Sequence, residues 1–179
     1  ENRPEQQAED LHALVRALGA GPVELFGSSG GAITGLALVT AHPEDVVTFV
    51  AHEPPLIELL PDAEHVNAAT DLITRTYHEK GWGAGMALFI AQTSWQGELT
   101  PDFGAEPPDP ATFGLPVDDD GSRDDPLLSG NSAPVTAYHP DIEALKASPT
   151  RIVVAVGVES HGLITWRTSV ALADALEAA

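Results

Sequence analysis

The sequence contains no cysteine and few positive charges. The lack of cysteine excludes a disulfide scaffold, a thiol nucleophile and any cysteine-ligated zinc or iron–sulfur site. Eight lysines and arginines stand against 27 acidic residues, which gives a formal net charge of −19 with histidine neutral. The cations are scattered and form no basic stripe. Because phosphate backbones and anionic membranes attract basic surfaces, we expect neither nucleic acid nor a membrane as a partner.

Long hydrophobic runs are missing as well. No stretch reaches the roughly 18–20 apolar residues that a membrane helix needs, and no basic segment followed by an apolar core opens the chain. Nevertheless, 43% of the 179 residues are hydrophobic, which is too many for a disordered chain. This composition predicts a soluble, globular, cytoplasmic protein of one domain. The abundance of alanine and the preference for arginine over lysine are typical of bacterial proteins.

Both ends of the chain show alternating helix and strand patterns. Apolar residues recur on one helix face in residues 4–18. Further helices are expected over 32–41 and 165–176, and short apolar runs predict strands over 23–26, 46–51 and 151–156. Nearly continuous apolar strands are typical of parallel sheets. We therefore predict an α/β fold with a mostly parallel sheet, covered by helices on both faces.

The middle of the chain has a different character. Residues 56–100 show no strand signal, and helices are expected over 66–77 and 85–92. Seven prolines between Pro101 and Pro134, together with eight acidic residues, predict a long irregular or partly mobile loop. Asp141 then stands where it would cap a short helix ending at Lys146.

Residues 27–31 read Gly27-Ser28-Ser29-Gly30-Gly31, a Gly-x-Ser-x-Gly pattern between an expected strand and an expected helix. A nucleophile on such a tight turn needs small residues two positions before and after it, so that the neighbouring backbones can approach. Only Ser29 meets this condition, because Phe26 lies two positions before Ser28. We therefore predict that Ser29 is a nucleophile and that the N–H of Gly30 is one donor of an oxyanion hole.

Three segments resemble the α/β-hydrolase fold family. Its central nucleophile segment is similar to VELFGSSGGAITGLALVTAHPEDVVTFVAHEPPL, and its strand before the acid loop is similar to DIEALKASPTRIVVAVGVES. The helical cap of many members is similar to DLITRTYHEKGWGAGMALFIAQTSW. The resemblance implies core segments at 1–55 and 136–179, and a cap with the acidic proline-rich loop at 56–135, all within one domain. It also implies the serine branch of esterases, lipases and thioesterases, because dehalogenases and epoxide hydrolases use aspartate where Ser29 stands.

Two positions compete for the acid of a catalytic triad. Glu53 ends the strand after the nucleophile, where some family members carry their acid. In the commoner location, the family's Gly-x-x-Asp is replaced by Gly157-Val158-Glu159-Ser160, so that Glu159 is the alternative acid. The catalytic histidine is not identified. His161 has the right chain order, but it lies in the acid loop itself.

The resemblance implies further parts that the sequence does not show. Family members place an oxyanion loop and several strands before the helix expected at residues 4–18, and a histidine loop after a final strand. We therefore expect the chain to be a partial member of the family. The second oxyanion donor and the catalytic histidine are expected outside these residues.

The functional expectation is a serine hydrolase that cleaves a small ester or related acyl substrate through an acyl-serine intermediate. One alternative is a non-catalytic scaffold of the same fold, serving as a ligand-binding or assembly module. Another is an acyltransferase or cofactor-free peroxidase on that fold. No cofactor is expected, and the histidines show no metal-ligand spacing along the sequence, so no metal is expected either. A homodimer is a further expectation.

Overall fold

The computed structural model describes residues 3–177, which form two compact units. The first unit runs from the amino end of the chain to Leu60 and resumes at Pro134. The second unit, Pro61–Ala133, is inserted between these two segments of the first and falls within the cap predicted at 56–135. Its role as a cap stays a prediction. Among the described residues, no helix has the length and apolar character needed to cross a membrane.

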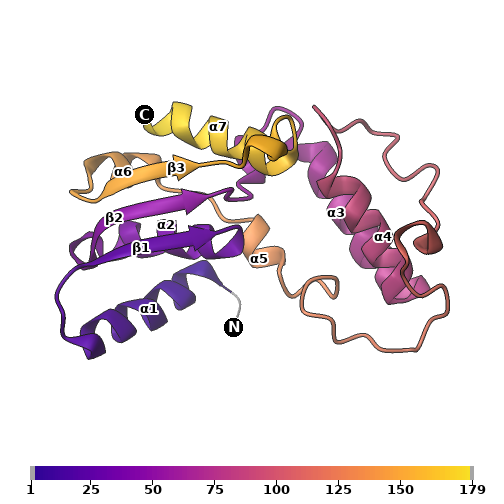
Figure 1. The fold of residues 1–179 in the computed structure, drawn as a ribbon, viewed down its shortest axis with the longest axis horizontal. Coiled ribbons are helices and arrows are strands. Elements are labelled where there is room, and N and C mark those ends of the chain that lie inside the picture. Colours follow the sequence, from indigo (N-terminus) through magenta and orange to yellow (C-terminus); the bar gives the residue numbers. More distant parts are fainter. Residues whose placement is uncertain (1–2, 178–179) are drawn as a thin grey trace. The chain divides into compact units, whose positions relative to one another are not determined.

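A three-stranded parallel sheet forms the centre of the first unit (Figure 1). Its strands are β1 (Val23–Ser28), β2 (Val46–His52) and β3 (Arg151–Ala155), and β2 lies in the middle. The prediction of an α/β fold with a parallel sheet is confirmed. Both β1 and β2 extend beyond their predicted ends, and Ser28 is paired with His52 where the two strands end.

Four longer helices complete the first unit: α1 (Pro4–Leu18), α2 (Gly30–Ala41), α6 (Ile142–Ala147) and α7 (Ile164–Leu176). All four were predicted, and α1 has the predicted bounds. The predicted cap of α6 is also present, because the Asp141 carboxylate accepts a hydrogen bond from the Ala144 N–H at 3.0 Å. Shorter elements are η1 (Pro43–Asp45), η2 (Ile57–Leu59), α5 (Ala133–Thr136) and η4 (Val158–Ser160).

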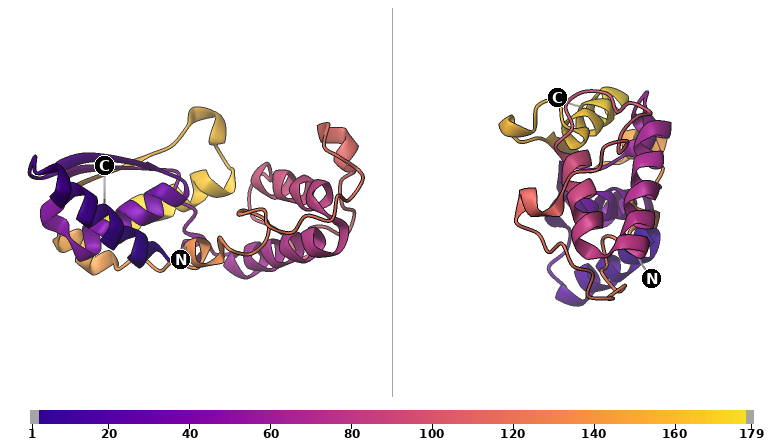
Figure 2. Two further views of the ribbon diagram at one scale, coloured as in Figure 1. Left: turned by 90° about the horizontal axis from the view of Figure 1, so that it is seen from below. Right: turned by 90° about the vertical axis from the view of Figure 1, so that its right-hand side faces the viewer.

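Helices cover only one face of this sheet, as Figure 2 (left) shows. Leu25, Phe49 and Ile152 point to that face and pack into one core with residues of α2 and α7. On the other face Phe26 is 65% exposed. The expectation that helices cover both faces is therefore wrong for the described residues. The apolar strand runs were correctly recognised, but alternate side chains of a strand point to opposite faces, and here only one of these faces meets helices.

The second unit consists of a helical pair and an irregular segment. Its helices are α3 (Ala63–Lys80) and α4 (Trp82–Thr93), which confirm and extend the two predicted helices. A single turn, η3 (Pro110–Phe113), interrupts the irregular segment. Buried side chains from both helices and from the irregular segment form one core: Ile73, Tyr77, Leu88 and Leu128. This small core holds the irregular segment against the helical pair.

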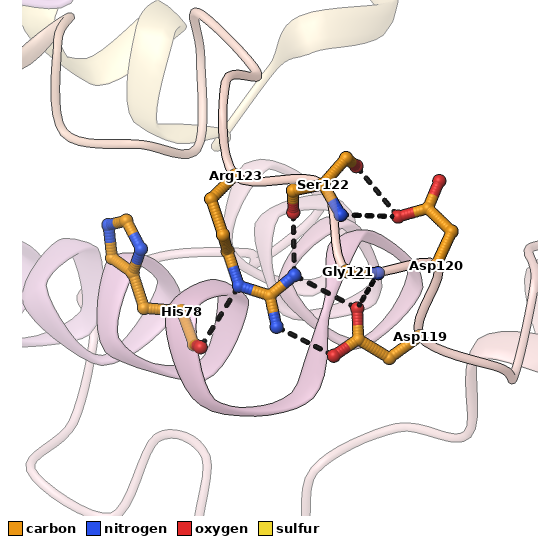
Figure 3. A network of polar contacts seen from close by, with 6 residues as sticks. All are labelled: His78, Asp119, Asp120, Gly121, Ser122 and Arg123. Atoms are coloured by element: carbon orange, nitrogen blue, oxygen red, sulfur yellow. Dashed lines mark hydrogen bonds and ion pairs between the residues drawn. The ribbon is translucent and has the colours of Figure 1, made fainter.

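Polar contacts also tie the acidic loop to the helices of its own unit (Figure 3). The Arg123 guanidinium donates to both carboxylate oxygens of Asp119, at 2.9 and 2.6 Å, and to the backbone oxygen of His78 at 3.0 Å. The hydrogen bonds from Arg123 hold the pKa of Asp119 at about 2. Trp82 donates to the Asp125 carboxylate at 3.0 Å. The predicted irregular course of this loop is confirmed, and these contacts fix parts of it in place.

Candidate active site

Ser29 occupies a strained turn between β1 and α2. Its φ of 53° and ψ of −123° lie in a region that side chains other than glycine rarely adopt. The turn is held on both sides: the Ser29 N–H donates to the His52 backbone oxygen at 2.9 Å, and the Ser29 oxygen accepts from the Ala32 N–H at 2.9 Å. The Ser29 side chain is exposed and caps no helix N–H. Its hydroxyl is therefore presented at the surface by a rigid backbone.

The glycines around Ser29 do not contribute equally. A Cβ at Gly27 would lie 2.5 Å from the backbone oxygen of Gly31, so that only glycine fits without a shift of the backbone. A Cβ at Gly31 would meet nothing within 4 Å. The close approach that the pattern predicted is thus present at Gly27, two positions before Ser29, and absent at Gly31, two positions after it.

The amide groups that open α2 lie next to the Ser29 hydroxyl in the chain. The first hydrogen bonds of this helix come from Ala32 and Ile33, which both donate to the Ser29 backbone oxygen. The N–H groups of Gly30 and Gly31 precede these bonds, as the first amides of a helix do. They lie at the positive end of the helix dipole. These amides are suited to donate hydrogen bonds to an oxyanion. One of them is the N–H of Gly30, the donor that the sequence predicted.

A serine–histidine pair lies beside this turn, and the sequence did not predict it. The Ser28 hydroxyl and the His52 Nδ1 are 2.9 Å apart. Both residues end their strands and are paired across the sheet, which explains the contact. The two residues lie 24 positions apart in the chain, so local spacing does not link them. Only the register between β1 and β2 shows that they meet, although neighbouring parallel strands with polar last residues are a signal to look for such pairs.

Glu53 follows β2 directly and also has a positive φ, 49°. Its carboxylate accepts from the Gly157 N–H at 2.9 Å and from the Thr165 hydroxyl at 3.0 Å. Burial raises the pKa of this carboxyl, but hydrogen bonds from Ser160, Gly157 and Thr165 and the nearby His52 lower it further, so the net effect is a pKa below the ordinary value. Glu53 is therefore ionised and held on the side of β3.

The alternative acid has a different environment. Glu159 is exposed within η4, and no hydrogen bond to its carboxylate is found in residues 3–177. His161 is exposed too, and its ring lies 4.5 Å from that of Trp166. Over the same described range, no histidine is hydrogen-bonded to the Ser29 hydroxyl or to the Glu53 carboxylate. Of the two acid candidates, only Glu53 is oriented by the fold.

Comparison with known proteins finds relatives of this chain, among them a bacterial protein. The chain is 30% identical over 190 aligned residues to the "Uncharacterized hydrolase YraK" of Bacillus subtilis (strain 168). The match covers 98% of this chain and 60% of that protein, so the chain spans about three fifths of the relative's length. No protein-family model and no solved structure matches the chain. The word hydrolase in that name describes the relative, and its bearing on this chain belongs to the proposal below.

Proposed function

We propose that this protein is a serine hydrolase of the α/β-hydrolase family, that it cleaves a small ester or related acyl substrate, and that Ser29 is its nucleophile. The proposal rests on one observation, the backbone conformation of Ser29. A positive φ at a serine between a parallel strand and a helix, with a clash at Gly27 that excludes any side chain, is typical of a nucleophile elbow. The relative named a hydrolase is a second line of support.

In this mechanism the Ser29 Oγ attacks the carbonyl carbon and transfers its proton to a general base. The carbonyl oxygen becomes an oxyanion, which the N–H of Gly30 stabilises at the start of α2. The base returns the proton to the leaving alcohol, and an acyl-serine remains. Water then attacks this ester and releases the acid, which restores the Ser29 hydroxyl.

Glu53 is the acid in this proposal. The acid of a triad has to stay ionised while it orients a histidine and stabilises its charge. Glu53 meets the first condition because hydrogen bonds from Gly157, Ser160 and Thr165 keep its pKa low. Those partners also place the carboxylate beyond the carboxyl end of the parallel sheet, the end at which Ser29 lies. In open α/β sheets, ligands bind at this end of the strands.

Ser28 is the competing nucleophile, because it already contacts His52. A serine with a bonded histidine can act as a nucleophile when a third group orients the histidine. The Glu53 carboxylate, however, bonds to Gly157, Ser160 and Thr165. Ser28 is also the last residue of the regular strand β1 and lacks the strained backbone of Ser29. Ser29 is therefore the better supported nucleophile.

The test is covalent labelling with a fluorophosphonate, followed by peptide mapping. We expect one adduct, on Ser29, and we expect Ser29→Ala to abolish labelling and the turnover of short-chain p-nitrophenyl esters. Ser28→Ala is the matched control, since it removes the adjacent hydroxyl, and it should still be labelled. An adduct on Ser28 would assign the nucleophile to Ser28. A folded protein that is not labelled at all would favour the non-catalytic scaffold.

A further inference from the structure

A second cluster of chemically active side chains lies where α1 meets the turn between α2 and β2. His12 comes from α1, and His42 and Glu44 come from the turn and from η1. Each of these three residues offers one possible ligand atom, a ring nitrogen or a carboxylate oxygen, and the three atoms lie within 4.8 Å of one another. The two imidazole rings are stacked, with centroids 3.7 Å apart. The fold thus brings His12 next to two possible metal ligands that lie about thirty residues further along the chain.

Each histidine of this cluster has a carboxylate on one ring nitrogen. The His12 Nδ1 is 2.6 Å from the Asp45 carboxylate, which is only 3% exposed. The His42 Nε2 is 2.9 Å from the Glu9 carboxylate. A carboxylate bound to one nitrogen of a histidine fixes the tautomer, so the other nitrogen carries the lone pair. In the neutral form of the two rings, the His12 Nε2 and the His42 Nδ1 are therefore the nitrogens that carry the lone pair.

The remaining carboxylate lies beside one of these acceptors. The Glu44 carboxylate is 3.8 Å from the His42 Nδ1, and its side chain is 64% exposed and so able to move. A carboxylate that faces a nitrogen lone pair gains nothing from the proximity, whereas a cation between the two would be attracted to both. The ring nitrogens and the carboxylate together make a two-histidine, one-carboxylate donor set, which suits a divalent transition metal.

We propose that His12, His42 and Glu44 bind a divalent transition metal ion of the zinc type, with Asp45 and Glu9 as the carboxylates that orient the two histidines. Donor atoms around a tetrahedral zinc ion lie about 3.3 Å apart, given bonds of about 2.0–2.1 Å. The three donors start within 4.8 Å, so small side-chain rotations, which also unstack the rings, bring them together. Water completes the coordination.

The surroundings of this site favour a cation. The chain carries a formal net charge of −19, and three carboxylates, Glu9, Glu44 and Asp45, surround the two rings. A cavity of about 420 Å³, lined in part by Arg16, Glu44 and Asp45, opens beside the cluster and admits water. Arg16 is exposed in the last turn of α1 and makes no ion pair with these carboxylates among the residues described. The His12 and His42 side chains are themselves 29% and 20% exposed, so water and ions can reach the donors.

The metal site is independent of the proposed hydrolase site. The amino ends of β1 and β2 lie on the side of η1, whereas Ser29 and Glu53 follow the carboxyl ends of these strands. A bound ion would clamp α1 to the connection between α2 and β2. Because an ion that binds only the folded state stabilises it, the expected role is structural.

The test uses the protein without a histidine tag, stripped of metal with a chelator and titrated with ZnCl₂. Calorimetry should show one strong site per chain, and at a hundredfold excess over Kd the Tm should rise by roughly 5–10 °C. Glu9→Gln, which removes only the partner of His42, should weaken binding about 10-fold. Cobalt(II) in place of zinc should give the visible absorption bands of a four-coordinate site.

Three variants decide the assignment. Glu44→Gln keeps the shape of an exposed side chain and should fold normally, yet it should lose most of the affinity; His42→Ala should abolish strong binding. His139→Ala is the matched control, because His139 lies in the same unit outside the cluster and is 72% exposed. Equal zinc affinity in wild type, Glu44→Gln and His42→Ala would overturn the proposal, as would a wild-type protein whose Tm does not respond to zinc.

Discussion

At the scale of single residues, strain marks the proposed site. Three non-glycine residues among those described have a positive φ, and two of them, Ser29 and Glu53, directly follow neighbouring strands. Such conformations cost about 1–3 kcal/mol each and persist only where the surrounding structure enforces them. Here the hydrogen bond from Ser29 to His52 and the bonds that hold Glu53 provide this enforcement. The third residue, Glu177, ends α7 in the left-handed conformation common after helices.

Glu53 and Glu159 can be distinguished by how much their substitution changes the free energy of unfolding. Replacing the ionised, hydrogen-bonded Glu53 in Glu53→Gln should lower the free energy of unfolding at neutral pH by about 1–3 kcal/mol. Folding lowers the pKa of Glu53 below its ordinary value of 4.5. Its contribution is therefore complete above that value and is lost as the pH falls through the lower pKa of the folded state. The difference between wild type and variant should shrink accordingly, as urea unfolding from pH 7 to pH 3 can measure.

The matched variant is Glu159→Gln, which changes an exposed carboxylate in the neighbouring loop. It should alter the free energy of unfolding by less than about 0.5 kcal/mol at every pH, as most surface substitutions do. If Glu159→Gln and Glu53→Gln destabilise the protein equally, or if the effect of Glu53→Gln is independent of pH, the ionised anchoring of Glu53 is refuted.

At the scale of elements, the acidic loop shows how an irregular segment is fixed. Arg123 joins Asp119 to the carboxyl-terminal end of α3 through the backbone oxygen of His78 (Figure 3). The Asp125 carboxylate accepts a hydrogen bond from the indole N–H of Trp82 in α4. It also accepts from the backbone amides of Leu127 and Leu128. These bonds replace the backbone pairing that a helix or strand would supply. The segment thus has order without regular secondary structure.

Arg123→Ala should release this loop. Without the guanidinium, the amides around residues 119–123 should exchange their hydrogens several-fold faster. The reason is that opening of the loop no longer requires the hydrogen bonds of Arg123 to break. Arg75→Ala, an exposed arginine of α3, is the control and should leave exchange in the loop unchanged. Hydrogen exchange followed by mass spectrometry measures both. Unchanged exchange in Arg123→Ala would show that the core around Tyr77 and Leu128, and not Arg123, orders the loop.

At the scale of the whole molecule, charge dominates. A formal net charge of −19 on 179 residues leaves many like charges close together. Their repulsion destabilises the folded state, and salt screens it over a distance that falls from about 30 Å at 0.01 M to about 3 Å at 1 M. The eight lysines and arginines can neutralise only a minority of the 27 acidic residues.

We therefore expect the Tm to rise when NaCl is increased from about 0.01 M to about 0.5 M. The measurement is thermal unfolding followed by circular dichroism on chelator-treated protein, so that bound metal does not contribute. KCl should give the same rise, because screening does not depend on the identity of the cation. A Tm that falls with salt would mean that the ion pairs outweigh the repulsion.

The sequence by itself determined where the helices and strands of the first unit lie, and that a tight turn stands at Ser29. The strand, glycine-rich turn and helix around Ser29 follow from local spacing, because φ, ψ and close approach at Gly27 involve residues next to one another in the chain. Helix α1 and the cap at Asp141 were predictable for the same reason. Sequence also placed Glu53 at a strand end, although it could not choose between Glu53 and Glu159.

Only the tertiary structure decided which distant residues meet. The pairing of Ser28 with His52 depends on strand register. The anchoring of Glu53 depends on a loop about a hundred residues further along the chain. The exposed face of the sheet depends on where the helices pack. The histidines showed no metal-ligand spacing along the sequence, yet the packing of α1 against α2 brings His12 beside His42. Local patterns are set by neighbours in the chain, whereas these contacts are set by burial of the shared core.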